Sequence, residues 1–526
     1  MTNSQFSLLP NATQSRTALP SFTSPITNSS ISNVTYMNTT DPLVQYVLEC
    51  PYEESLCNKV GTSIRAAIDQ FTEVVNVKNS LLIKVKYSSF CKDYGCANDS
   101  FGWGLPSSQF ILPFEDGADL NFIYPQALAK QLAPYSSTSV WAKYDILIKI
   151  NHDVHLRTIK SKESETDEVL SNGVFWFFNN SYSPPIKPHQ IDFRYIVLHE
   201  LIHGFGFLSS WAAYFWAEKS PFRMLVDGVI DPLELQLVTP FPYWFITEDT
   251  GPTYVTGFQP TTIFDKFLVN IDTELNVTSV SQLSDLAFGM QNFCVQDSNA
   301  FIVNFIRGFN AANQSTMAHK LWLSMSQPET LIFKFQSPTI ANSSYNLIPY
   351  LNQTYKSMTL LTGGNIFSAP NFAYPEVIMN RPGIMISHLD NQYWDTVDFL
   401  MTQKYHKGKR LEELVNHYYK KIPIIKYNTT VSSTNLTIIE KRYMSPIGPG
   451  ILRILDSMGY STVLTKTNYT TDGNVKTPKS RSLCDDSNTN HGLKPTPSST
   501  SHAIKLHNNI LLIISALILS IKYNMK

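Results

Sequence analysis

The stretch HELIHGFGF, residues 199–207, places His199 and His203 four positions apart with Glu200 between them. On an α-helix, side chains at positions i and i+4 lie on the same face, so these two imidazoles can bind one metal ion. Zinc favours nitrogen ligands, and an open coordination position holds a water molecule whose pKa the metal lowers. Glu200 is placed to act as the general base for that water. The stretch therefore predicts a hydrolytic zinc site with His199 and His203 as ligands and Glu200 as catalytic residue.

The residues around this stretch predict a buried helix with a sharp end. Apolar side chains recur at helical spacing over residues 191–202. Gly204 and Gly206 follow the second histidine, and glycine ends helices through a left-handed turn without steric cost. We therefore expect the helix to end at Gly206. Because the chain then turns away, the third metal ligand is expected from a later segment.

A later stretch, ISHLD at residues 386–390, contains His388 and is followed by DFLMT at residues 398–402. Together with the HELIH stretch, these residues resemble the leishmanolysin-like surface proteases, which are metzincin-type zinc peptidases with a distant third histidine. The sequence is also similar to secreted bacterial and fungal metallopeptidases that carry an HExxHGxGF pattern. The resemblance implies that His388 is the third zinc ligand and that Met401 is the methionine of the turn beneath the metal.

Several alternatives remain open for the third ligand and the turn. In the compact metzincin arrangement the third histidine would stand where this chain has Ser209. A carboxylate such as Glu218 or Glu234 could replace it as the third ligand. His388 could be an ordinary hydrogen-bonded histidine, and Met401 could simply fill a gap in the core, as methionine often does.

The resemblance implies an α+β fold of zincin or metzincin type with two lobes. The first lobe would contain a mixed sheet and the active-site helix, and a large insertion would precede the third ligand. The length of 526 residues and the 43% hydrophobic composition allow one large catalytic unit. The expected segments are a disordered extension rich in Ser, Thr and Asn (1–42), an N-terminal lobe (43–208), an insertion (209–387), a C-terminal lobe (388–470), a polar linker (471–509) and a hydrophobic tail (510–526).

An extended peptide substrate would align with an exposed strand edge near the helix. The alternating run at residues 145–151 and the aromatic run at residues 173–178 are the two candidates for that edge, although both could be interior strands. Other patterns predict helices at residues 60–75, 280–288 and 300–309, a strand at residues 82–87, and a closing helix at residues 448–459.

The charge of the chain argues against nucleic acid as a partner. The formal net charge is −1 and charged residues make up 16% of the chain, so the chain lacks the basic surface of a nucleic-acid-binding protein. The expected partner is a protein or peptide substrate, and we expect a monomer.

Several features predict export to the cell surface or the extracellular space. Sequons for N-glycosylation occur from Asn11 to Asn468, and six cysteines permit disulfides, with Cys50 near Cys57 and Cys91 near Cys96. Residues 1–20 contain no recognisable signal peptide.

The apolar run at residues 510–521 follows a polar stretch with small residues. Twelve helical residues extend about 18 Å, which is short of the roughly 30 Å hydrocarbon layer. This run therefore predicts a GPI-type lipid-anchor signal rather than a membrane-spanning helix.

Two functions follow from these patterns. The first is a secreted or surface-anchored zinc endopeptidase, and the alternative is a catalytically inactive surface glycoprotein that keeps a zincin scaffold for binding. Glu200 favours the enzyme, because a protein that only binds has no chemical need for a general base between the two histidines.

Overall fold

In the computed structural model of the protein, the described residues are 34–94, 100–112, 121–132, 140–156, 159–160, 167–168, 173–179, 183–216, 221–246, 252–272, 279–335, 343–363, 384–431, 437–465 and 469. The predicted polar linker 471–509 and hydrophobic tail 510–526 lie outside these residues, as do residues 1–33. The fold is α+β and contains a mixed sheet.

A five-stranded sheet forms the N-terminal part of the protein, in the order β1-β2-β3-β7-β4. Strands β2, β3 and β7 run parallel, whereas the two edge strands run antiparallel to their neighbours. Along β3, apolar residues alternate with half-exposed lysines, so one face of the sheet is buried. The bounds are β1 (Val34–Asn38), β2 (Val44–Glu49), β3 (Leu81–Ser88), β7 (Ile146–Asn151) and β4 (Gly102–Pro106).

Strand β1 corrects the predicted N-terminal extension. Residues 1–42 were expected to be disordered, yet Val34–Asn38 pair with residues 45–49 of β2. Val, Thr and Tyr favour strands, and pairing satisfies the backbone groups on the outer side of β2. Part of the segment that composition assigned to the extension therefore forms a strand.

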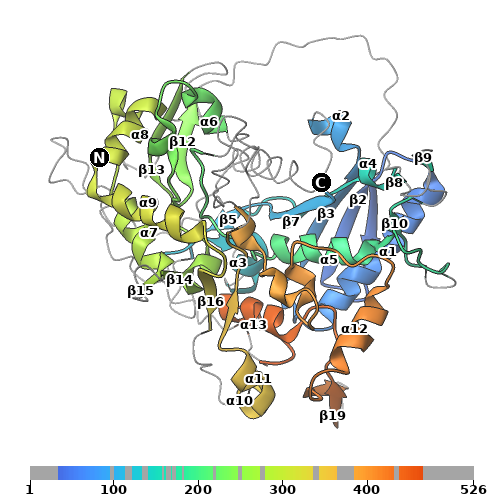
Figure 1. Ribbon diagram of the computed structural model, residues 1–526. Helices are drawn as coiled ribbons and strands as arrows, with labels where there is room; N and C mark the ends of the chain where they lie inside the picture. The colour runs from blue at the N-terminus through green and yellow to red at the C-terminus, as the bar shows by residue number, and fades with distance from the viewer. Residues whose placement is uncertain are drawn as a thin grey trace, which may run out of the picture.

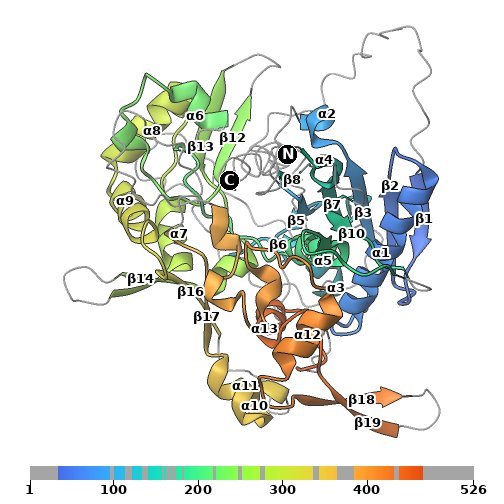
Figure 2. The ribbon, with the colours of Figure 1, turned by 45° about the vertical axis from the view of Figure 1, so that its right-hand side comes forward.

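Two helices lie side by side on one face of this sheet, as Figures 1 and 2 show. They are α1 (Glu54–Thr72) and α5 (Phe193–Gly204), and α5 contains the HELIH stretch. Helix α1 contacts α5 and buries Ile64, Ile68 and Phe71 in the common hydrophobic core. The helix predicted at residues 60–75 corresponds to α1, which begins at residue 54 and ends at residue 72. The strand predicted at residues 82–87 is β3. All residues of α5 are buried, including the polar side chains of His199, Glu200 and His203.

The edge strand beside α5 is β4, which corrects both predicted candidates. The run at residues 145–151 forms β7, an interior strand, and the aromatic run at residues 173–178 contributes only β10 (Phe175–Trp176), which pairs with β11 (Ile191–Asp192) in a separate sheet. Strand β4 can approach α5 closely because Gly102 and Gly104 have no side chains on the helix side.

Gly104→Ala is expected to lower the free energy of unfolding by at least ~3 kcal/mol, at the upper end of overpacking effects. A Cβ atom at Gly104 would lie 1.7 Å from the carbonyl oxygen of Glu200, so strand and helix would have to separate. The control is Gly289→Ala in helix α7 (Leu283–Gln291), where nothing lies within 4 Å of the added atom. Urea denaturation of both variants measures the effect, and equal stability of the two variants would contradict it.

The predicted insertion, residues 209–387, forms most of the green and yellow part of Figure 1. A four-stranded sheet has the order β15-β14-β16-β17, and a hairpin pairs β12 with β13. The helix predicted at residues 280–288 begins as strand β15, because Ser279–Gln282 pair with β14, and only then continues as α7. The helix predicted at residues 300–309 corresponds to α8. The bounds are α6 (Pro221–Val226), α8 (Ile302–Ala311), α9 (Asn313–Met325), β12 (Pro242–Ile246), β13 (Thr253–Phe258), β14 (Leu268–Asp272), β15 (Ser279–Gln282), β16 (Leu331–Lys334) and β17 (Ser357–Thr359).

Short helices, short strands and 3-10 turns connect the sheets and helices described above. They are α2 (Phe90–Tyr94), β5 (Gln109–Phe110), β6 (Tyr124–Pro125), α3 (Gln126–Leu132), α4 (His152–His155), β8 (Ile159–Lys160), β9 (Asp167–Glu168), α10 (Ser344–Leu347), α11 (Pro349–Thr354) and the 3-10 turns η1 (Pro232–Leu235), η2 (Ile263–Phe267), η4 (Asp297–Ala300), η5 (Ile384–Ser387), η6 (Asn391–Tyr393) and η7 (Phe399–Met401).

The C-terminal part contains α12 (Leu411–Tyr419), the hairpin β18 (Lys426–Val431) and β19 (Thr437–Arg442), and α13 (Pro449–Met458). Helix α13 confirms the predicted closing helix, with Pro449 in its first turn and Gly459 after it at a φ of 120°. The buried carboxylate of Asp398 accepts hydrogen bonds from the backbone of Gly450 and Ile451, which begin this helix, and from the Tyr355 hydroxyl.

The free energy of unfolding of Asp398→Asn is expected to increase, relative to that of the wild type, as the pH rises. Burial raises the pKa of Asp398 from 3.8 to about 6, although the hydrogen bonds from Tyr355 and the helix backbone lower it. Between these two values the folded protein binds more protons than the unfolded chain, so the contribution of Asp398 to stability falls as the pH rises. Asparagine does not titrate. The difference in unfolding free energy, measured in urea at pH values of about 4 and 7, should therefore shift in favour of the variant, and a constant difference would contradict this account.

Cys50 and Cys57 form a disulfide with a Cα–Cα distance of 5.8 Å, as their predicted proximity allowed. Cys91 is also disulfide-bonded, whereas Cys96 lies outside the described residues. Within the described part of the chain, no helix combines the length and apolar character needed to cross a membrane.

Candidate metal centre

Helix α5 carries His199, Glu200 and His203, and all three are buried. It begins after Asp192, whose side chain accepts a hydrogen bond from the backbone N–H of Arg194 and caps the helix. The Arg194 guanidinium lies between the carboxylates of Asp192 and Glu412, and so ties the start of α5 to α12. These charge-assisted contacts, buried at Asp192 and partly exposed at Glu412, fix the direction of the helix between the sheet and the C-terminal part.

The helix ends two residues before the predicted end. Its last residue is Gly204, and the turn that follows contains Gly206 at a φ of 102°. Gly206 therefore has the left-handed conformation that was predicted, but it lies beyond the helix. The turn leads directly to Phe207, whose carbonyl oxygen faces back to the helix and accepts a hydrogen bond from His203.

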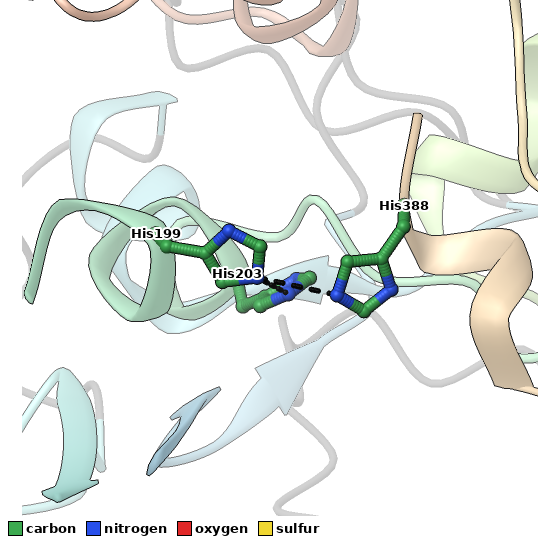
Figure 3. A group of neighbouring side chains, drawn as sticks. All are labelled: His199, His203 and His388. Atoms are coloured by element: carbon green, nitrogen blue, oxygen red, sulfur yellow. Dashed lines mark hydrogen bonds between the residues drawn. The ribbon is translucent and has the colours of Figure 1, made fainter. Parts of the chain in front are cut away.

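The structure brings His199, His203 and His388 together, although His388 is distant in sequence. The Nε2 atom of His199 lies 3.2 Å from the Nε2 atom of His203 and 3.2 Å from that of His388. Figure 3 shows the three rings pointing toward a common point, two from α5 and one from the segment after η5. Four-coordinate zinc with Zn–N distances of 2.0–2.1 Å separates its ligand nitrogens by about 3.3 Å. These two separations fit a tetrahedral metal site, and the ligand atoms of all three histidines lie within 4.8 Å of one another.

The hydrogen bonds of the Nδ1 atoms determine which nitrogen of the His199 and His203 rings carries hydrogen. His199 Nδ1 lies 2.7 Å from the carbonyl oxygen of Leu400, and His203 Nδ1 lies 2.8 Å from that of Phe207. A carbonyl oxygen only accepts, so both Nδ1 atoms carry hydrogen and each neutral ring has a bare Nε2 lone pair. Burial also lowers the pKa of His199 to about 3 and that of His203 to about 4. Two lone pairs thus face each other at 3.2 Å, an arrangement that a bound cation stabilises.

His388 is positioned by two neighbouring segments. Its carbonyl oxygen accepts a hydrogen bond from the N–H of Leu361, and the N–H of the next residue, Leu389, donates to the carbonyl oxygen of Met401. Met401 is fully buried in η7, and the preceding residue, Leu400, provides the carbonyl that holds His199. The turn that contains Met401 therefore contacts α5 and the His388 segment together.

Glu200 lies next to the histidine cluster and to the edge strand. Its side chain is 4% exposed, and burial raises its pKa to about 8, although a hydrogen bond from the backbone N–H of Gly104 lowers it. A carboxyl group with a pKa near neutrality can both accept and donate a proton at physiological pH. A divalent cation beside it would lower the pKa again by favouring the carboxylate.

Tyr405 is a site residue to which the sequence patterns gave no role. Its ring centroid lies 5.5 Å from that of His199, and burial and the charge of Glu200 raise the pKa of its phenol well above the usual value. The hydroxyl therefore stays protonated and can donate a hydrogen bond. The signal in the sequence was its position four residues after Met401.

Among the described residues, one group of side chains could hold a metal ion, and it consists of His199, His203 and His388. Glu234, an alternative third ligand, lies in η1 and is not part of this group. Glu218, the other alternative, lies outside the described residues.

A family model described as SPBPB7E8-like matches residues 9–166 and 159–352, which together span about two thirds of the chain. The chain belongs to this family. The SPBPB7E8-like match includes the HELIH stretch of α5 and ends before His388. A protein of Schizosaccharomyces pombe (strain 972 / ATCC 24843), described as uncharacterized protein PB7E8.01, is 25% identical over 169 residues. That similarity covers 31% of this chain and 25% of the yeast protein. No solved structure matches the chain.

Proposed function

We propose that this protein is a zinc-dependent endopeptidase with a zincin or metzincin fold in two lobes. The observation that carries the proposal is the convergence of three imidazoles, two of which have bare Nε2 atoms facing each other at 3.2 Å beside a buried glutamate. His199, His203 and His388 would hold the metal, and the turn of Met401 would support it from beneath. Three neutral imidazoles favour zinc among the common metals of hydrolases.

A zinc ion bound there would supply a Lewis acid and lower the pKa of a coordinated water. Glu200 accepts the proton of the attacking water and then donates it to the leaving amine, so a single carboxyl group acts as base and as acid. The carbonyl oxygens of Leu400 and Phe207 keep His199 and His203 in the tautomer that binds metal. Tyr405 is the candidate donor to the developing oxyanion.

The substrate would bind as an extended peptide along β4. This strand ends the five-stranded sheet, and its backbone N–H at Gly104 reaches the Glu200 carboxylate. A peptide that added to this edge would lie beside the catalytic residue, with main-chain hydrogen bonds that do not depend on substrate sequence. Export is part of the proposal, supported by the Cys50–Cys57 disulfide and the sequons, with surface attachment through a C-terminal lipid anchor.

Metal analysis together with a casein cleavage assay on the purified protein tests the proposal. We expect one zinc ion per chain and cleavage that is lost on treatment with 1,10-phenanthroline and restored by added zinc. Stoichiometric zinc without cleavage would favour the alternative, an inactive surface glycoprotein that uses the scaffold for binding. Absence of zinc would contradict the proposed zinc-dependent enzyme.

A further inference from the structure

Asp265, in η2 of the insertion, is a fully buried carboxylate surrounded by hydrogen-bond donors. It accepts hydrogen bonds from the hydroxyl of Ser209 at 2.6 Å and from the backbone and hydroxyl of Ser210 at 2.9 and 2.5 Å. The backbone N–H of Thr262 donates to it as well, at 3.1 Å. A carboxylate only accepts and offers about four lone-pair sites, and these four donors engage both oxygens.

The segment that Asp265 holds, residues 207–210, contacts two of the three histidine positions. Its first residue, Phe207, provides the carbonyl that accepts a hydrogen bond from His203. The backbone N–H of Ser209 donates to the hydroxyl of Ser387 at 3.0 Å, and Ser387 directly precedes His388. Residues 207–210 therefore connect the Nδ1 atom of His203 with the backbone segment that carries His388.

The same part of the insertion packs against this segment through apolar contacts. The ring of Phe264, which precedes Asp265, lies 4.8 Å from the ring of Phe207. The Thr262 hydroxyl donates to the carbonyl oxygen of Leu208 at 2.8 Å. The turn η2 thus holds residues 207–210 from one side through buried polar and aromatic contacts.

We propose that Asp265 is a positioning residue for the metal centre, which sets the relative placement of His203 and His388 through residues 207–210. This inference rests on the proposed function, because it concerns the same three histidines. The proposal gives the insertion a role in metal binding. Asp265 acts there through Ser209, which occupies the position of the third histidine in the compact metzincin arrangement. Such outer partners orient ligands and typically change metal affinity by about 10- to 100-fold when they are lost.

The test compares Asp265→Asn with Asp145→Asn, in full-length protein. Asp145 is also fully buried and accepts hydrogen bonds from Gln126, Lys130 and the backbone of Leu82, none of which belongs to residues 207–210. Zinc affinity is measured by competition with a chelator, and the visible spectrum of the Co²⁺-loaded protein reports ligand geometry. We expect Asp265→Asn to weaken zinc binding by about 10- to 100-fold and to change the Co²⁺ spectrum, and Asp145→Asn to change neither.

Ser387→Ala, which removes only the acceptor of the Ser209 N–H, provides a second variant in case Asp265→Asn does not fold. It is expected to weaken zinc binding and to change the Co²⁺ spectrum in the same direction. The role of Asp265 would be overturned if either folded variant kept the zinc affinity and Co²⁺ spectrum of the wild type. It would also be overturned if Asp145→Asn weakened zinc binding equally. Neither result would contradict the proposed function. A wild-type protein that binds no zinc would overturn both.

Discussion

Glu200→Gln is expected to lower kcat/KM for peptide cleavage by about 10²- to 10⁴-fold while zinc remains bound at wild-type stoichiometry. Glutamine matches the size of glutamate and can still accept the N–H of Gly104, but it cannot take a proton from water. The loss should appear in kcat, because proton transfer occurs in the transition state rather than in substrate binding. Steady-state kinetics on a quenched fluorescent peptide, together with metal analysis, measure both effects.

The control for this variant is Glu440→Gln, which removes an exposed carboxylate paired with Lys426 in the β18–β19 hairpin. It should retain wild-type kinetics, because an exposed ion pair contributes little to stability and the hairpin projects away from α5 (Figure 2). Wild-type cleavage by Glu200→Gln would show that another group accepts the proton, and the assignment of Glu200 would have to be withdrawn.

His388→Ala is expected to abolish cleavage and to weaken zinc binding by more than the ~100-fold that loss of an outer partner costs. The variant removes one of three nitrogens that converge within 4.8 Å, and two imidazoles alone leave an incomplete site. Equilibrium dialysis against a zinc buffer measures the affinity. His417→Ala, which removes an exposed histidine of α12, is the matched control and should bind zinc normally.

The same experiment separates the alternatives for the third ligand. If His388→Ala kept stoichiometric zinc with wild-type affinity, a carboxylate would have to complete the site. The described structure favours the histidine, because Glu234 is absent from the cluster that contains His388.

The parts of the site that follow from local sequence were predictable. The spacing of His199 and His203 puts them on one helix face whatever surrounds them, and the glycines after them indicate a turn. His388 was found only through a family resemblance, because no local pattern connects it to α5. The structure brings the three side chains together, while their role as zinc ligands stays a prediction.

Features that depend on distant pairing were not predictable. The edge of a sheet is set by the order of its strands, so residues 145–151 and 173–178 had the right pattern for strands but neither forms the edge beside α5. Strand β4 was missed because its two glycines weaken the strand signal, although they allow the approach to Glu200. Asp265 forms a local capping box with Thr262, but its contacts with Ser209 and Ser210 come from a loop more than 50 positions away.

Anomalous scattering at the zinc absorption edge, from crystals grown with equimolar zinc, tests the central claim most directly. The account predicts one strong peak within about 2.1 Å of the Nε2 atoms of His199, His203 and His388, with a fourth position open to solvent. A peak bound to other residues, or zinc held by α5 with His388 turned away, would contradict it.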